Sequence, residues 1–396
     1  MKKLLYVLPA IFLFLSCAQD QEDTLYQGFV DPPAEARPFV RWWWNGNHVE
    51  ADEIKRELDS MKKAGIGGVE INPIAMPDEA KDIGTEPVKW LSEEWNKLLA
   101  LAAQEAQNRG MIADMIVGSG WPFGGEFLQP AQYTQRVMVN RIPVNGPAEL
   151  NLSYGELLNR MDEDHSLQQA ESNEVFFISL VPVNASDESQ ATDLTGHYEN
   201  KRLQYSVDRG SYELVYGIHQ KGHRNVMHGA LGASGNVMDH YSEEITREYL
   251  QRLKKISEDT GIPLEKLLRA LFCDSIELAG ANWTDGFLKT FHETYGYSLK
   301  PYLPFVFYES HSGYQENTYN PDFKEELRRV RYDYNSLLVD VFLDNFTRTF
   351  QEFCTENGLK CRYQAYGTPF LMGMLEGYMI PDIPEANNWI YSAEMD

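Results

Sequence analysis

One order of features recurs along this sequence and limits the folds open to it: an apolar run of strand length, a polar or aromatic cluster, and then an amphipathic helix. The first example is PFVRWWWNGNH followed by EADEIKRELDSMKKAG, in which Ile54, Leu58 and Met61 share one helical face. IGGVEINPI and MIADMIVGSGW follow as further strands, and the helix of LSEEWNKLLALAAQEAQNRG, with Ser92 as its N-cap, lies between them. Strands that alternate with helices of this length are typical of parallel βαβ units.

The alternation of strands and helices is interrupted from about residue 136 to residue 220. In this segment, polar and turn-rich stretches such as NASDESQATD separate the β-rich runs QRVMVNRIPV, EVFFISLVPV and GSYELVYGIHQ. That pattern predicts an antiparallel β domain inserted into a loop of the parallel fold. The earlier order then resumes with the strand KLLRALFCDSIE, a long helix from about 321 to 357, and the strand KCRYQAYGTP.

We therefore predict an α/β fold in which a TIM-like (β/α)8 barrel carries an inserted antiparallel β domain. About six or seven strands can be counted before the sequence stops at YSAEMD, whereas a closed barrel has eight, so we expect an incomplete barrel. The predicted parts are a signal peptide (1–17), an acidic tether (18–35), the first part of the barrel (36–135), the inserted domain (136–220) and the truncated barrel continuation (221–396).

The first 17 residues, MKKLLYVLPAIFLFLSC, have the features of an export signal: two lysines, a short apolar run and a small residue before Cys17. The run is too short to span a bilayer comfortably. Its end, FLSC, resembles a bacterial lipoprotein signal, in which Cys17 is the lipidated residue. We therefore expect an outer-membrane or cell-surface protein held by a lipid anchor, with a periplasmic or secreted protein as the alternative.

Charge and cysteine content exclude several classes of partner and site. The net charge of −24 argues against nucleic acid and anionic membranes as partners, because both would repel the chain. The same charge is compatible with hard cations such as calcium, which prefer oxygen ligands. Apart from Cys17, the cysteines are Cys273, Cys354 and Cys361, and their spacing matches neither a disulfide framework nor a zinc site. We expect them to be buried free thiols.

Polar and aromatic side chains gather where the predicted barrel strands end, which is where barrel enzymes carry their working residues. These residues are Trp43, Trp44, Asn45, Asn47, Glu70, Asn72, Trp121, Asp274, Glu277, Arg362, Gln364, Tyr366, Glu376 and Glu385. The sequence has no GxSxG elbow, no HExxH motif and no phosphate-loop lysine. Carboxylate chemistry is therefore favoured. Two carboxylates are sufficient for glycoside hydrolysis, in which one protonates the leaving oxygen and the other activates water or attacks the sugar.

Structural interpretations of the same residues stay open at this point. Asp274 and Glu277 are also typical of a helix start, where the macrodipole favours acids. Glu70 is equally compatible with a structural salt bridge. The WWWN run is often a packed barrel floor, and the histidines show no metal-ligand spacing.

The segments RPFVRWWWNGNHVEADEIKRELDSMKKAGIGGVEINPI, GSGWPFGG, DSIELAGANWT and YQAYGTP together resemble glycoside hydrolase family 106, the α-L-rhamnosidases, which are often surface or periplasmic enzymes of Bacteroidetes. The resemblance extends roughly from Ala34 to the end of the sequence. It implies a calcium-dependent, inverting exo-hydrolase on a (β/α)8 barrel with β-sandwich additions. Its partner would be a rhamnose-containing glycan of plants or bacteria, from which terminal L-rhamnose is removed.

The resemblance also implies that strand-end glutamates carry catalysis. That role transfers most readily to Glu277, with Glu376 or Glu385 as the second carboxylate. The predicted substrate-binding residues are Trp44, Asn45, Asn47, Glu70, Trp121, Asp274, Gln364 and Tyr366. Family members are longer than this chain, so the alternative is a non-catalytic glycan-binding surface lipoprotein or an inactive fragment of such an enzyme. A barrel hydrolase acting on another sugar or on an amide is the third possibility.

Overall fold

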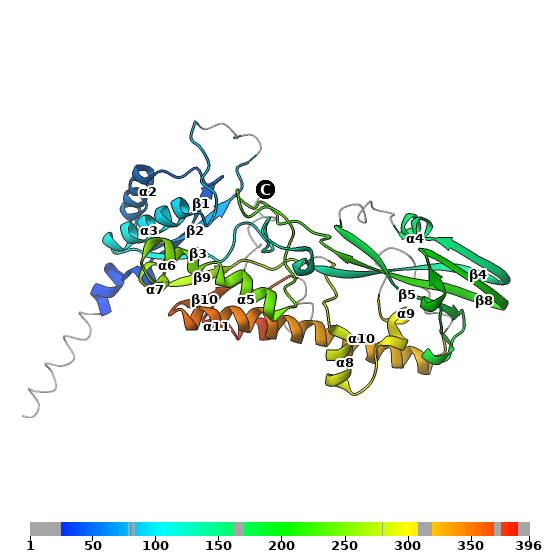
Figure 1. Ribbon diagram of the computed structural model, residues 1–396. Coiled ribbons are helices and arrows are strands. Elements are labelled where there is room, and N and C mark those ends of the chain that lie inside the picture. Colours follow the sequence, from blue (N-terminus) through cyan, green and yellow to red (C-terminus); the bar gives the residue numbers. More distant parts are fainter. Residues whose placement is uncertain are drawn as a thin grey trace, which may run out of the picture.

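The computed structural model describes residues 25–77, 80, 84–161, 170–278, 280–307, 319–367 and 374–386. Cys17, the predicted signal peptide and part of the predicted tether lie outside these ranges. Two sheets form the frame: a parallel sheet flanked by helices at one end of the molecule and a long antiparallel sheet at the other (Figure 1). None of the helices in these ranges has the length and apolar character needed to cross a bilayer.

The parallel sheet has six strands, and their spatial order follows the order of the chain, β1-β2-β3-β9-β10-β11. The strands are β1 (Phe39–Asn45), β2 (Gly68–Ile74), β3 (Ile112–Ile116), β9 (Ala270–Cys273), β10 (Lys360–Tyr363) and β11 (Ile383–Pro384). Every neighbouring pair is parallel. The predicted α/β fold with one parallel and one antiparallel sheet is thus confirmed. Within the described ranges β1 and β11 are edge strands, so a closed barrel is not shown.

Helices alternate with these strands as the sequence pattern predicts. They are α2 (Ala51–Lys63), α3 (Glu93–Asn108), α5 (Glu243–Gln251), α6 (Lys254–Thr260), α7 (Leu264–Leu267), α8 (Phe287–Tyr295), α9 (Leu303–Val306), α10 (Pro321–Phe342), α11 (Thr349–Glu356) and α12 (Met374–Tyr378). The short helical turns are η1 (Ala34–Ala36), η3 (Pro130–Gln132), η5 (Glu188–Gln190), η6 (Thr195–His197) and η7 (Lys300–Tyr302), and η9 (Leu343–Arg348) is a π-helical turn. Ser92 caps α3 by accepting a hydrogen bond from the Trp95 amide, as predicted. The predicted helix from 321 to 357 is continuous through α10, η9 and α11.

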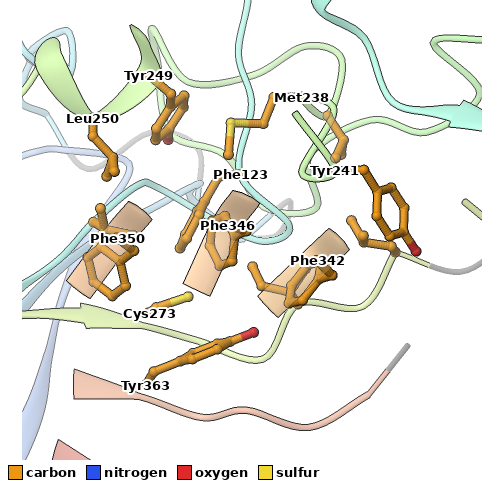
Figure 2. Close-up of a cluster of buried hydrophobic side chains, with 14 of the residues drawn as sticks. Phe123, Met238, Tyr241, Tyr249, Leu250, Cys273, Phe342, Phe346, Phe350 and Tyr363 are labelled. Atoms are coloured by element: carbon orange, nitrogen blue, oxygen red, sulfur yellow. The ribbon is translucent and has the colours of Figure 1, made fainter. Parts of the chain in front are cut away.

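The main core lies between the parallel sheet and the helices that cover its outer face. Figure 2 shows one part of it, where Phe346 of η9 packs against Tyr363 of β10 and Phe123. Cys273 of β9 belongs to the same cluster. Cys273, Cys354 and Cys361 are all buried free thiols, as predicted.

The antiparallel sheet is built on a long hairpin and has its own smaller core. Its strands are β4 (Gln135–Ser153), β5 (Ser172–Pro182), β6 (Thr192–Asp193), β7 (Tyr198–Glu199) and β8 (Arg202–Lys221). They lie in the order β4-β8-β5-β6, with β7 paired to β8. Helix α4 (Tyr154–Met161) covers one face and buries Leu157 and Met161 in that core. The outer bounds of β4 and β8 lie within one residue of the predicted insertion, 136–220.

The two sheets are joined at the start of β4. The Asn282 side chain accepts a hydrogen bond from the Val137 amide (2.7 Å) and donates one to the Val137 carbonyl (3.0 Å). The fully buried Asp239 is hydrogen-bonded nearby to Thr284 (2.7 Å), Gln135 (3.2 Å) and the Tyr241 amide (3.0 Å). Burial raises the pKa of Asp239 to about 7, against the opposing effect of the Thr284 and Tyr241 hydrogen bonds.

Asp239 is therefore expected to make stability depend on pH. The folded protein keeps this proton up to about pH 7, whereas the unfolded chain releases it near pH 4, so the free energy of unfolding falls as pH rises between these values. Between pH 5 and pH 8 the loss of this proton should lower the free energy of unfolding of the wild type by about 3 kcal/mol. Asp239→Asn has no such proton, so its free energy of unfolding should not show this fall. Urea unfolding at the two pH values measures this difference. The exposed Asp208→Asn is the control, and an unchanged difference for Asp239→Asn would contradict the assignment.

Candidate active site

The inner face of the parallel sheet carries charged and polar side chains, unlike the outer face that packs on the helices. Arg41 of β1 lies opposite Glu70 of β2, and Glu70 lies opposite Asp114 of β3. Phe272 of β9 lies opposite Arg362 of β10. Since side chains alternate between the two faces of a strand, these residues share one face. The strand register thus assembles a charged layer from residues that are far apart in the sequence.

Arg362 is at the centre of this layer and is buried. Its Nη1 donates to Asp114 Oδ2 (2.6 Å), its Nη2 to Glu70 Oε2 (3.2 Å) and its Nε to Glu385 Oε1 (2.5 Å). Burial acts to lower the pKa of Arg362, but the neighbouring carboxylates, Glu385 first among them, raise it above its ordinary value. Because a guanidinium presents five donors in a fixed plane, one arginine can hold three carboxylates, two on β2 and β3 and one directly after β11.

Arg41 is the second cation of the layer. Its Nε lies 3.1 Å from Glu70 Oε1, and its Nη1 donates to Asp274 Oδ2 at 2.9 Å. The Phe272 ring lies against both guanidinium groups, with its centroid 4.9 Å from Arg41 Cζ and 5.1 Å from Arg362 Cζ. Burial raises the pKa of Glu70 even though Arg41 and Arg362 act to lower it.

The segment after β9 places Asp274 and Glu277 at the carboxyl edge of the sheet. Asp274 is buried, and besides Arg41 it accepts a hydrogen bond from the Ser275 amide (2.8 Å). Glu277 is half-buried, and its Oε1 accepts a hydrogen bond from Ser275 Oγ (3.2 Å). Residues 274–278 are not helical, and α8 begins only at Phe287. The interpretation of these two acids as a helix start is therefore wrong.

The end of β10 brings Gln364 to the same edge. The Gln364 amide donates to the Cys273 carbonyl (3.0 Å), which aligns the segments that follow β9 and β10. A Cβ placed on Gly367, three residues later, would lie 3.4 Å from Glu277 Cγ, so this loop runs against Glu277. Gln364 is buried, and its Oε1 has no hydrogen-bond partner within the described part of the chain. Such an acceptor costs about 1–3 kcal/mol unless a ligand or water donates to it.

Two loops cover the carboxyl ends of β2 and β3. Trp121 and Met227 exchange backbone hydrogen bonds of 3.1 and 2.9 Å, and the rings of Trp121 and His228 lie 5.4 Å apart. The Ala75 amide donates to the His228 carbonyl (2.8 Å), which holds the second loop over the end of β2. Trp121 is half-buried and His228 is exposed, so both rings are partly open to solvent at the carboxyl ends of β2 and β3.

Three predicted substrate-binding residues are too buried for that role, which corrects the prediction. Trp44 is 3% exposed, and Trp42 and Trp95 pack edge-on against it at 5.8 and 5.7 Å, on the face of the sheet that the helices cover. Asn47 is fully buried and accepts a hydrogen bond from Trp95 Nε1 (3.3 Å). Glu70 is 4% exposed, and both of its oxygens are held by arginines, which matches the structural salt bridge.

Other predicted residues have side chains that are exposed or half-buried near the carboxyl edge of the parallel sheet. Asn45 is exposed at the end of β1, and Tyr366 is half-buried beside Gln364. Trp43 is the tryptophan of the WWWN run that reaches the inner face, where 41% of it is exposed and Arg41 lies 5.4 Å from its ring. The geometry therefore favours Trp43 over Trp44 as a surface for a sugar ring.

Of the two candidates for the second carboxylate, the structure brings only Glu385 to the inner face. Glu376 is exposed on α12 and lines a separate cavity of about 980 Å³ with Asp340, Asp344 and Arg348. Within the described ranges, no contact joins Glu376 to Glu277 or Glu385. The prediction of Glu376 as a catalytic residue is not supported by this placement.

Arg224 is a residue of this region that sequence reasoning missed. It follows β8 in the loop that carries Met227 and His228, a segment with no periodicity to mark it. Burial lowers the pKa of Arg224, while the charge of Glu277 acts to raise it.

The charged layer does not fit a calcium site. No group of three or more His, Cys, Asp or Glu side chains in the described ranges is arranged to hold a metal ion. The carboxylates of Glu70, Asp114, Asp274 and Glu385 are instead paired with arginines.

A family model described as alpha-L-rhamnosidase matches residues 30–151 and 140–396. The chain is similar to the solved structure of a rhamnosidase from Novosphingobium sp. PP1Y, with a TM-score of 0.59 and 18% identity over 85% of this chain and 47% of that one. It is also 25% identical, over 379 residues, to a protein of Formosa agariphila named "Putative beta-glucuronidase", covering 87% of this chain and 31% of that protein. The chain therefore spans less than half the length of either relative.

Proposed function

The chain belongs to glycoside hydrolase family 106, the α-L-rhamnosidases, and on this premise we propose that it is a glycosidase that removes terminal α-L-rhamnose from a polysaccharide or glycoside. The observation that carries the proposal is that Glu277 follows β9 and Glu385 follows β11, at the carboxyl edge of the parallel sheet that carries the layer of paired charges. This edge is where barrel enzymes place their catalytic residues. The substrate proposal is supported by the family description.

The surroundings of the two glutamates suit different roles in an inverting reaction. Glu385 accepts a hydrogen bond from the buried Arg362 and so suits the base that activates water. Glu277 has only the Ser275 hydroxyl as a hydrogen-bond partner in the described ranges and suits the acid that protonates the leaving oxygen. An inverting enzyme needs roughly 6.5–9.5 Å between the two carboxyl groups to admit water. Proton NMR of the first-formed anomer tests the proposed inversion.

Uncharged side chains near the carboxyl edge of the parallel sheet are suited to bind a sugar. The unpaired Gln364 Oε1 can accept a hydrogen bond from a sugar hydroxyl. Trp43 and Trp121 offer aromatic faces, onto which the apolar side of a pyranose can pack. Asp274 and Asn45 stay predicted substrate contacts.

Three further proposals rest on the sequence and the family resemblance. They are a calcium requirement, lipidation of Cys17, and attachment of the protein to the outer membrane or cell surface, where it would meet a rhamnose-containing glycan. No step of the proposed reaction depends on the metal, since the described residues offer no ligand group for it.

Chelation tests the calcium proposal. Treatment with EGTA should abolish rhamnoside hydrolysis, and added Ca²⁺ but not Mg²⁺ should restore it, because calcium accepts a larger and more flexible oxygen shell than magnesium does. Activity that is unchanged after chelation and dialysis, with metal content checked by elemental analysis, would contradict this proposal.

The proposed activity is tested by comparing aryl glycosides. Aryl α-L-rhamnoside should be cleaved, whereas aryl β-glucuronide, aryl β-galactoside and an aryl amide should not. Cleavage of another substrate in place of the rhamnoside would indicate a different barrel hydrolase. Calorimetric binding of L-rhamnose without cleavage would instead support the non-catalytic glycan-binding alternative.

A further inference from the structure

Arg224 presents a guanidinium group that forms no ion pair with a carboxylate of the described residues. It is half-buried, and its Nε is buried without a hydrogen-bond partner in the described ranges. Its one hydrogen bond there runs from Nη2 to the sulfur of Met227 (3.8 Å), which is a weak acceptor. Arg41 and Arg362, by contrast, are each paired with at least two carboxylates. Most of the hydrogen-bonding capacity of Arg224 is therefore available to a ligand.

Among the described residues, the charge that acts on Arg224 is that of Glu277, the proposed catalytic acid. Glu277 is close enough for its charge to act on Arg224, yet the two groups form no ion pair within 4.0 Å. Arg224 thus keeps an unpaired positive charge within electrostatic range of the group that would protonate the leaving oxygen.

The aromatic pair of Trp121 and His228 is connected to Arg224 through Met227. Met227, which contacts Arg224, is joined to Trp121 by two backbone hydrogen bonds. The ring of Trp121 lies against the ring of His228, the residue that follows Met227. A guanidinium beside an aromatic face suits a sugar that carries a negative charge, because the ring packs on the sugar while the planar fork holds the anion with two hydrogen bonds.

From this arrangement, and resting on the proposed function, we propose that Arg224 forms a subsite for an anionic group on the sugar attached to the terminal rhamnose. Rhamnose is neutral, so the negative charge must lie on the neighbouring residue, as the carboxylate of a uronic acid or as a sulfate ester. The chain has a net charge of −24 and four carboxylates on the inner face. A local cation is what would admit an anionic glycan past this charge.

Three disaccharides test the subsite: α-L-rhamnose joined to glucuronic acid, the same disaccharide with glucose, and the glucose form with a sulfate ester. We expect kcat/KM for at least one anionic form to exceed that for the neutral form by about 10- to 100-fold, as for a hydrogen bond to a charged group. Arg224→Met should lower kcat/KM for the preferred anionic form much more than for the neutral form, which removes the preference. Arg224→Lys should keep part of the preference, since it retains the charge but not the fork. Comparison of the glucuronic acid disaccharide with the sulfated one identifies which anion Arg224 binds.

The matched control is Arg247→Met, which removes the same charge from an exposed surface ion pair and should leave the preference intact. Equal loss on all three substrates in Arg224→Met would show that Arg224 positions Glu277 and would overturn the subsite. The same holds if the wild type does not prefer an anionic form. If the wild type cleaves none of the disaccharides, calorimetry decides: tighter binding of an anionic form by the wild type than by Arg224→Met supports the subsite while the hydrolase proposal fails. Equal binding overturns the subsite.

Discussion

Glu277→Gln should lower kcat for an α-L-rhamnoside with a poor leaving group by about a thousandfold, as expected when a general acid is removed. The amide keeps the size of the side chain and can still meet the Ser275 hydroxyl, which now contacts Glu277 Oε1 at 3.2 Å. Binding of L-rhamnose, measured by calorimetry, should therefore change little. Steady-state kinetics on a rhamnosyl-glucose disaccharide, whose leaving sugar hydroxyl needs protonation, measures the loss of turnover.

Comparison of two substrates with different leaving groups shows which proton transfer a variant has lost. A dinitrophenyl leaving group needs no protonation, so its rhamnoside should lose far less activity in Glu277→Gln. Glu385→Gln should impair both substrates, because the base acts on water whatever group leaves. Glu376→Gln, on the exposed helix α12, is the matched control and should stay within about twofold of the wild type. Full activity of Glu277→Gln, or a large loss in Glu376→Gln, would overturn the assignment.

The order of the parallel strands could be predicted from the sequence because each strand and helix has its own local signal. Ser92 illustrates this at the level of one residue, since a serine before an apolar helical pattern has a direct physical role as the N-cap. Between residues 136 and 220, alternating β runs replace the strand–helix order, and the observed strands Gln135–Ser153 and Arg202–Lys221 lie at the two ends of this segment.

The face of the sheet on which each strand side chain lies could not be predicted as well from the sequence. In VRWWWN both faces carry large or charged groups, so alternation alone did not tell that Trp42 and Trp44 face the helices while Trp43 faces inward. Arg41 was the available signal, because a charged residue two positions before Trp43 marks the face that is not packed on helices.

The charge layer depends on partners that only the fold brings together. Arg362 and Glu70 are 292 positions apart, and neither position reveals the other. Arg224 and Glu376 lie in irregular segments where no period gives a direction to the side chain. Glu376 was therefore placed at the site by its position after a strand, whereas the structure puts it on α12 beside a different cavity.

Arg362→Met should destabilise the protein by about 3–5 kcal/mol, the usual loss when one partner of a buried ionic network is removed. Methionine fills much of the volume but leaves Glu385 without an ion-pair partner in the described ranges and removes one of the cations that hold Glu70 and Asp114. Urea or guanidinium unfolding, monitored by tryptophan fluorescence, measures the free energy of unfolding. The exposed pair Arg348–Asp344 supplies the control, for which Arg348→Met should cost less than about 0.5 kcal/mol.

The pH dependence of Arg362→Met separates the loss of charge from the loss of packing. Burial already raises the pKa of Glu70, and Arg362 is one of the groups that act to lower it, so removing Arg362 should raise this pKa further. A carboxyl whose folded pKa exceeds its unfolded value stabilises the folded protein at low pH, and that stabilisation is lost as pH rises through the folded pKa. The penalty of Arg362→Met should therefore be smaller at pH 5 than at pH 8. A penalty that is equal at both values would show that the methionine only disturbs packing, and the inner-face carboxylates would then not need Arg362 to stay charged.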